Sequence, residues 1–242
     1  YKKKIFPKYI FLEKPLLNKT IQKIKQFPKK TLFLTNFIFS FNYHWIQFKK
    51  EIIKIKENCS LNYCWFFNQA YFKNKKQTWK IDNSQGGGLI QYYLPHAIYN
   101  ILNIFSNVKF IKINKKRFSN KILVYVELFF LINKQKLILK MSNNSRLNLH
   151  KFEVFNKVDN KKYLLVNNSK KWLSNFEIFI RGKKIKKIQK FLKKGDGREN
   201  VLLDIYSNIN KYFATKNIAR TQSLTYKTFG IIDKINKKIN DT

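Results

Sequence analysis

Residue types that build covalent and metal sites are scarce in this sequence of 242 residues, and each scarcity excludes a class of protein. Cys59 and Cys64 are the only cysteines, too few for a disulfide framework and wrongly spaced for a zinc site. The only histidines are His44, His96 and His150, which argues against a metal cluster. No apolar run reaches the ~20 residues of a membrane-spanning helix, so the default expectation is a protein of the reducing cytoplasm with no membrane partner.

Glycine is also scarce, and the seven glycines do not form the phosphate-binding motifs of nucleotide enzymes. None of them builds Gly-x-Gly-x-x-Gly after a strand, the motif that binds a dinucleotide pyrophosphate. No Gly-Lys-Ser or Gly-Lys-Thr follows the triplet at 86–88, which excludes a P-loop. The triplet is therefore expected to serve backbone geometry, through positive φ or close approach to a ligand.

Acidic residues are few, so the formal net charge is +37, with 50 Lys and Arg against 13 Asp and Glu. Such a charge is typical of nucleic-acid binders, because lysines neutralise phosphates. However, only five of the 50 are arginine, the residue on which base-reading proteins rely. Abundant Lys, Asn, Ile, Phe and Tyr are typical of A/T-rich codons, so mutational bias is favoured over a polyanion-binding surface, which stays open as the alternative. Attraction of anionic ligands follows in either case.

The order of elements predicts two kinds of architecture. Residues 1–35 have the pattern strand, helix, strand, with strands at 9–12 and 31–34 and a helix from about Asn18 to Phe27. Helices are expected at 43–53, 89–105, 200–213 and 223–239. The remaining strands are expected at 61–67, 108–113, 122–132, 136–141, 149–155, 163–166 and 176–180. Their short spacing after residue 107 predicts a large, mainly antiparallel sheet, with one face covered by helices and one open.

Two short motifs bear on function. The first is Glu13-Lys14-Pro15, at the end of the apolar strand predicted at 9–12. In an open α/β sheet the carboxyl end of a strand faces the ligand crevice, although the tripeptide alone also fits a solvated turn. The second is the triplet at 86–88 with His96 on the helix that follows it.

In this order and spacing, the two motifs resemble those of the Gfo/Idh/MocA family of oxidoreductases. In that family the Glu-Lys-Pro lysine reaches the nicotinamide and the reacting hydroxyl, and a glycine-rich turn opens a helix that carries a catalytic histidine. The resemblance implies an α/β plus α+β protein. Residues 1–35 would end a Rossmann-type NAD(P)-binding domain, whose start the family places roughly ninety residues upstream. Residues 36–242 would form the substrate-binding and oligomerisation domain.

Two further features of that second domain follow from the resemblance. The helix at 223–239 would pack back toward the nucleotide domain. The open face of the sheet is often an oligomer surface in the family, which suits a chain rich in aromatic residues and implies a homo-oligomer.

The implied reaction is hydride transfer between NAD or NADP and a carbinol or carbonyl of a sugar, nucleotide sugar or cyclitol. Glu13, Lys14 and Pro15 would lie against the cofactor, with Lys14 also bonding the reacting hydroxyl. His96 would be the base that takes the hydroxyl proton, since histidine as a residue type has a pKa near the operating pH. The alternative for His96 is a hydrogen-bonded histidine on an apolar helix.

Two positions depart from the family pattern. Tyr92 lies four residues before His96, on the same helical face, where many relatives have an aspartate. A tyrosine can relay a proton but cannot supply a carboxylate, which leaves a catalytically inactive relative as an alternative. Tyr99 occupies the position of a second aspartate.

Three residues are weaker candidates for substrate binding: Trp79, Tyr93 and Arg198. Trp79 could stack on a sugar or be a core residue. Arg198 could pair with an anionic substrate group or lie on the surface beside Asp196.

Overall fold

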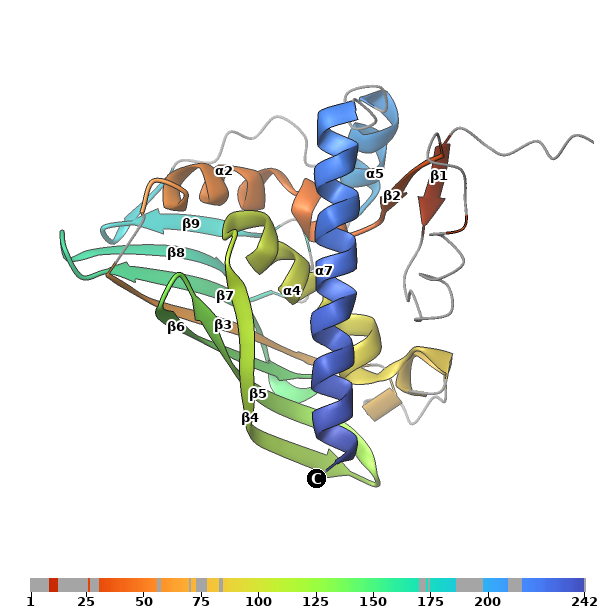
Figure 1. Cartoon of the computed structure of the whole chain (residues 1–242). Coiled ribbons are helices and arrows are strands. Elements are labelled where there is room, and N and C mark those ends of the chain that lie inside the picture. The colour runs from red at the N-terminus through yellow and green to blue at the C-terminus, as the bar shows by residue number, and fades with distance from the viewer. Residues whose placement is uncertain are drawn as a thin grey trace, which may run out of the picture.

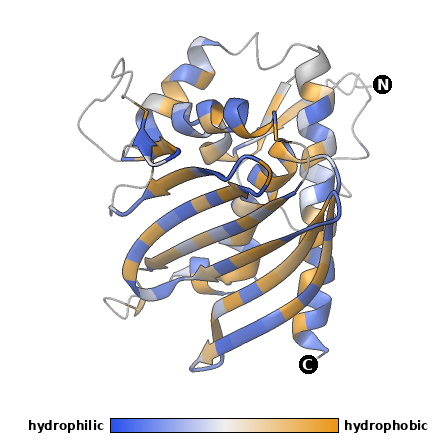
Figure 2. Ribbon diagram, turned by 90° about the vertical axis from the view of Figure 1, so that its left-hand side faces the viewer, coloured by the Kyte–Doolittle hydropathy of each residue, from blue (hydrophilic) through white to orange (hydrophobic). Residues whose placement is uncertain are grey.

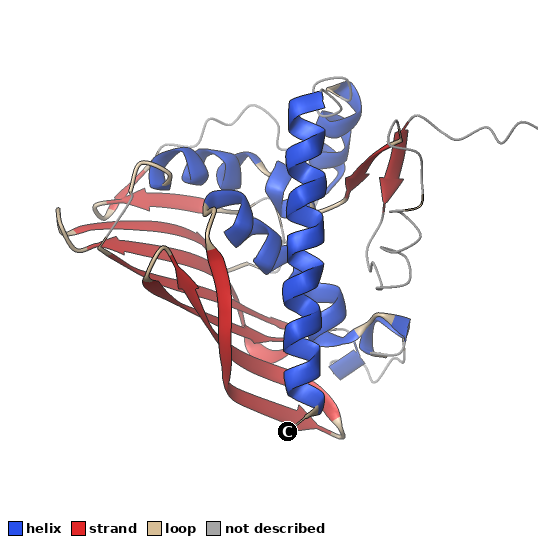
Figure 3. Cartoon of the chain, viewed as in Figure 1, coloured by secondary structure: helices blue, strands red, loops and turns tan. Residues whose placement is uncertain are grey.

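The structure is a computed structural model. It describes residues 9–12, 26, 31–55, 58–69, 71–72, 78–82, 85–169, 173, 175–185, 198–208 and 215–241. A large sheet carries helices on one side, and a pair of short strands lies apart from it (Figures 1 and 3). None of the described helices is both long and apolar enough to cross a membrane.

The large sheet has eight strands in the order β10-β9-β8-β7-β3-β6-β5-β4. The strands are β3 (Cys59–Asn68), β4 (Val108–Ser119), β5 (Ile122–Ile132), β6 (Gln135–Ser142), β7 (Asn144–Asn156), β8 (Lys161–Asn167), β9 (Glu177–Ile180) and β10 (Lys183–Lys184). Only β3 and β6 pair in parallel; every other neighbouring pair is antiparallel. The predicted large, mainly antiparallel sheet is confirmed.

Alternating side chains give the sheet two unlike faces. Along β3, Leu61, Tyr63 and Trp65 are buried under the helices, while the residues between them are half-buried on the other face. Tight turns join the strands at Asn120-Lys121 and Asn133-Lys134, where both residues of each pair have positive φ. Type I′ hairpin turns require this backbone, and asparagine tolerates it better than most residues. The Asn and Lys clusters between the predicted strands therefore mark the turns.

The helices that cover the sheet are α2 (Tyr43–Ile52), α4 (Leu94–Ile104) and α7 (Thr215–Asn240), with α5 (Arg198–Ser207) near the start of α7. Asn42 caps α2, since its side-chain oxygen accepts from the backbone N–H of His44 at 3.0 Å. Every residue of α4 from Leu94 to Leu102 is buried, because α7 packs on the side of α4 away from the sheet.

The two short strands are β1 (Tyr9–Leu12) and β2 (Leu32–Thr35), which pair in parallel. A strand, helix, strand unit produces such a pair, although the helix predicted at 18–27 lies outside the described residues except for Gln26. α7 packs against β2, with the rings of Phe33 and Tyr226 edge to face at 5.8 Å. The domain boundary at residue 35 stays a prediction.

Several element boundaries differ from the sequence predictions. β4 continues to Ser119 instead of ending at 113, and α7 begins at Thr215 instead of 223. Residues 114–119 are mostly polar, so their strand propensity is low, but pairing with β5 holds them extended. α5 ends at Ser207, earlier than the predicted 213.

Candidate active site

The first motif, Glu13-Lys14-Pro15, lies outside the described residues, but the strand that leads into it is described. β1 ends at Leu12, whose carbonyl accepts a hydrogen bond from the N–H of Asn36 at 2.9 Å. The next residue, Phe37, is fully buried and packs edge to face against His96, with ring centroids 5.9 Å apart. The end of β1 therefore lies close to the helix that carries the second motif.

Each of the three glycines of the second motif is required by the local backbone geometry. Gly86 and Gly88 have φ angles of 81° and 77°, which residues other than glycine rarely adopt. Gly87 has no room for a side chain, because an added β-carbon would collide with the carbonyl oxygens of Trp79 and Asp82. The N–H of Gly87 also donates to the Asp82 carbonyl at 2.7 Å. The expectation that the triplet serves backbone geometry is confirmed.

A wide helical turn follows the glycines. The segment η4 (Leu89–Tyr93) is π-helical, and the N–H of Leu94 reaches back five residues to the Leu89 carbonyl. Pro95, in the first turn of α4, has no N–H to continue a regular ladder. A π turn holds more residues than an α turn and is frequent at functional sites. The α-helical spacing used to place Tyr92 and His96 on one face therefore does not apply strictly here.

His96 lies inside an aromatic enclosure. His96 is 3% exposed. Its ring lies close to edge to face against the rings of Phe37, Phe39 and Trp65, at centroid distances of 5.9, 5.3 and 6.1 Å. This position fits a core histidine, and it also fits a base kept away from water until a substrate binds. The role of His96 stays a prediction.

The other predicted residues lie at different depths. Tyr93 is buried against Phe67 at 4.6 Å, and burial raises its pKa above the usual range. Tyr92 is half-buried and meets the ring of Trp79 edge to face at 5.2 Å. Trp79, on the short 3-10 helix η2 (Trp79–Ile81), is 41% exposed. Trp79 and Tyr92 therefore present an aromatic surface to solvent, whereas Arg198 is exposed at the start of α5.

His150 was missed by the sequence analysis as a site residue. It is 5% exposed, its ring stacks on Trp65 at 4.8 Å with the planes 9° apart, and it also meets Phe39 at 4.8 Å. His96 and His150 therefore contact the same two aromatic rings. No local pattern around His150 indicates this, because β7 brings it opposite Trp65 across the sheet.

The protonation of His150 follows from its surroundings. Burial lowers the pKa of His150 to about 3, so the imidazole is neutral. Its Nε2 lies 2.6 Å from the hydroxyl of Tyr63, whose pKa is raised by burial. A protonated tyrosine hydroxyl and a neutral imidazole can each donate or accept, so the direction of this hydrogen bond depends on which ring nitrogen carries the proton.

A small hollow opens beside His150 at this end of the sheet. Its polar residues include Asn167, whose side-chain oxygen accepts from both the N–H and the hydroxyl of Ser169 at 2.9 Å. Its lining is Phe39, Trp65, Phe66, Phe67, Asn148, Leu149, His150, Asn167 and Ser169. At about 20 Å³ this hollow has room for about one water molecule.

A scan of family models and a search of curated proteins find no match to this chain. Solved structures do match. UDP-N-acetylglucosamine 3-dehydrogenase from Acidithiobacillus ferrooxidans has a TM-score of 0.64 at 12% identity, covering 93% of this chain and 68% of that one. An oxidoreductase from Agrobacterium radiobacter, in complex with NAD+, L-tartaric acid and magnesium, has a TM-score of 0.66 at 12% identity, covering 94% and 70%.

A third match is the transcriptional regulator Gal80p from Kluyveromyces lactis, with a TM-score of 0.67 at 13% identity, covering 97% of this chain and 68% of that one. The structural neighbours are Gfo/Idh/MocA-type oxidoreductases and cover about 93% of the chain. At identities this low, the structural similarity establishes the fold alone. The chain therefore has the fold of the Gfo/Idh/MocA-type oxidoreductases.

Proposed function

We propose that the protein is an NAD(P)-dependent oxidoreductase that acts on a carbinol or carbonyl of a sugar, nucleotide sugar or cyclitol. One observation carries the proposal: β1, which leads into Glu13-Lys14-Pro15, ends beside Asn36, and the adjoining Phe37 packs on His96. This contact supports an arrangement in which two motifs more than seventy residues apart in the sequence would meet around one point. The similar structures, which include a nucleotide-sugar dehydrogenase and an oxidoreductase with NAD+, support this class of reaction.

The parallel pair β1 and β2 fits the nicotinamide end of a dinucleotide site, because strand ends in such sheets face the ligand crevice. The chain has no pyrophosphate motif, so that end of the cofactor would be held outside this sequence. Bound there, the nicotinamide would accept or donate the hydride. Glu13, Lys14 and Pro15 would contact the cofactor.

The proton would be handled by residues of this chain. His96 would take the proton of the reacting hydroxyl, while Lys14 would bond the same oxygen and stabilise its developing negative charge. Tyr92 would relay the proton toward solvent, since it lies half-buried beneath the exposed ring of Trp79. Trp79, Tyr93 and Arg198 would contact the substrate, with Trp79 stacking on its apolar face.

The test is an NADH and NADPH absorbance assay of the longest form of the protein that its gene encodes, over a panel of sugars, nucleotide sugars and inositols. Losing a general base typically lowers turnover about 10²- to 10⁴-fold, which is the expectation for His96→Asn. Lys50→Ala and Lys227→Ala, both at exposed helix positions, are the matched controls for Lys14→Ala. Undiminished turnover in His96→Asn or Lys14→Ala would reject the assigned roles.

A catalytically inactive relative is the second candidate function. It is favoured by Tyr92, which replaces the aspartate of many relatives, and by the similarity to a transcriptional regulator. Saturable binding of NAD or NADP, with no turnover of any panel member, would support this second function over the first.

We also propose that the open face of the sheet joins copies of the protein in a homo-oligomer. Figure 2 shows hydrophobic and hydrophilic residues alternating along its strands, and the half-buried Phe66, Phe129 and Phe155 belong to this face by register. The face also bears carboxylates paired with lysines, Glu127 with Lys140 at 3.4 Å and Glu153 with Lys162 at 2.8 Å.

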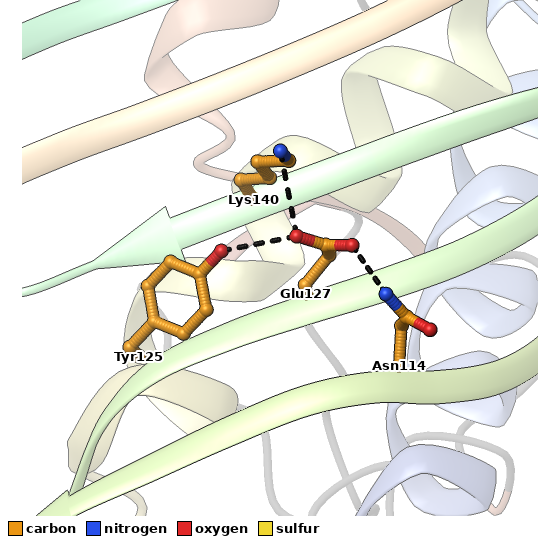
Figure 4. Close-up of polar contacts among 4 residues, drawn as sticks. All are labelled: Asn114, Tyr125, Glu127 and Lys140. Carbon is orange, nitrogen blue, oxygen red and sulfur yellow. Dashed lines mark hydrogen bonds and ion pairs between the residues drawn. The ribbon is translucent and has the colours of Figure 1, made fainter.

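The carboxylate of Glu127 shows how a negative charge on the open face of the sheet is compensated. Partial burial raises its pKa, but hydrogen bonds from Asn114 and Tyr125 and the charge of Lys140 outweigh this and lower it overall (Figure 4). A face whose charges are already paired loses less free energy on desolvation when a partner subunit covers it.

Sedimentation velocity at micromolar concentration should show a dimer or larger species, and Phe129→Lys should convert it to monomer. A wild-type monomer would reject the oligomer.

A further inference from the structure

Three helices bring two cationic side chains onto one residue at the carboxyl end of α4. Lys49 of α2 donates from Nζ to the side-chain oxygen of Asn103 at 2.7 Å. Arg220 of α7 donates from Nη2 to the backbone carbonyl of Asn103 at 3.1 Å and to the same side-chain oxygen at 3.5 Å. Two like charges therefore contact a single oxygen atom.

No carboxylate balances these two charges within the described part of the chain. The ion pairs found there involve other lysines, all of them on the sheet or its turns. Burial, and then the charge of Arg220, lower the pKa of Lys49 to about 8. Protonated Lys49 is thus held in an unfavourable field, which a bound anion would relieve.

Helix capping accounts for only part of the arrangement. Arg220 satisfies a carbonyl at the end of α4, and Lys49 lies in the last turn of α2, both favourable positions for a cation. Two helix ends supply about one negative charge in total, against two positive charges. Arginine has five N–H donors and lysine three, so most donors remain for a ligand. Arg220 is exposed, which leaves the site open to solvent.

We propose that Lys49 and Arg220, oriented by Asn103, bind a phosphate-type oxyanion, either free or as the phosphoryl group of a small metabolite. A tetrahedral oxyanion can accept from the two-pronged guanidinium and from the ammonium at once, whereas a carboxylate has only two oxygens for both. Asn103 follows His96 by seven residues, about 10 Å along a helix. The site is therefore separate from the proposed active site and does not depend on the proposed reaction.

The test measures the thermal unfolding midpoint at pH 7 and constant ionic strength while phosphate replaces chloride. Wild type should show a saturable rise. Lys49→Gln and Arg220→Gln should each weaken the fitted dissociation constant about tenfold or more, the effect of losing one charge-assisted hydrogen bond. Lys50→Gln and Lys227→Gln remove exposed cations from the same two helices and should bind like wild type. Circular dichroism confirms that every variant folds.

Parallel titrations with glycerol phosphate distinguish the two sources of the anion, because tighter binding than that of inorganic phosphate would identify an organic phosphate as the ligand. A rise that is absent, or that is the same in all five proteins, would overturn the proposal, since screening of the net charge does not depend on these two residues. Turnover is not measured, so failure here leaves the proposed reaction untouched.

Discussion

The two ends of α4 differ in almost every physical respect. At the amino end, a glycine turn and a π turn lead to His96, which aromatic rings enclose. At the carboxyl end, Asn103 contacts two cations, the half-buried Lys49 and the exposed Arg220. One helix thus separates a buried aromatic environment, where we propose proton transfer, from a charged one, where we propose anion binding. The net charge of +37 therefore says little about the chemistry at His96.

The largest effect on stability should come from adding a side chain within the glycine turn that precedes α4. Gly87→Ala places a β-carbon against backbone atoms of Trp79, Lys80 and Asp82, so we expect a loss of about 3 kcal/mol in the free energy of unfolding. Gly230→Ala is the matched control. Gly230 lies within α7 with open space around it, so alanine should stabilise by about 0.5–1 kcal/mol. Urea denaturation measures both, and equal effects would refute the close packing at Gly87.

Acid should destabilise the aromatic cluster through His150. Its pKa is lowered to about 3 in the folded protein from 6.5, so between these values the unfolded chain binds the extra proton. The free energy of unfolding should therefore fall as pH drops from 6.5 toward 3, by up to about 1.4 kcal/mol per pH unit from this residue. His150→Gln keeps a hydrogen-bonding side chain opposite Tyr63, cannot titrate, and should remove that part of the slope. An unchanged slope would mean that His150 titrates normally.

A smaller effect is expected from the hydroxyl beneath Trp79. If Tyr92 relays the proton, Tyr92→Phe should lower kcat about tenfold with KM nearly unchanged. This is less than the ~10²- to 10⁴-fold effect typical of a direct general acid or base, because a relay residue acts one step away from the reacting hydroxyl. Steady-state kinetics on the best panel substrate measures this. Wild-type kcat in the variant would remove Tyr92 from the mechanism, and a rise in KM alone would assign it to substrate binding.

The smallest effect belongs to the charged end. Lys49→Met removes a cation held against Arg220, and in phosphate-free buffer at pH 7 it should raise the free energy of unfolding by roughly 1 kcal/mol. Because the pKa of Lys49 is lowered to about 8 from 10.5, the unfolded state binds more protons between these values, so this residue's penalty fades as pH rises through that window. The gain in Lys49→Met should shrink accordingly. A gain that is independent of pH would contradict the charge argument, with Lys50→Met as the control.

Much of the fold could be predicted because its signals are local. The strand at 122–132 was predicted with its observed bounds, since an apolar run between turn-forming Asn and Lys pairs defines both ends. The end of β4 was wrong because residues 114–119 are held by pairing with β5 instead of by their own propensity. The start of α7 was wrong for a similar reason: among residues 215–222, Ile218 is the one buried apolar residue described.

The site was predictable only where a motif runs along the sequence. The triplet at 86–88 and His96 form such a motif, and the structure gives its glycines their expected backbone role. His150 reaches Trp65 through a strand pairing that spans 85 residues, and Arg220 reaches Asn103 across 117. Convergence of this kind depends on topology, so composition and spacing did not indicate it.

A double-mutant cycle of Lys14→Ala and His96→Asn on turnover tests the central claim most directly, namely that the two motifs serve one reacting carbon. If both residues act on the same hydroxyl, the double variant should be little less active than the less active of the two single variants. Losses that multiply, or a single variant with wild-type turnover, would show that the two motifs do not form one active site.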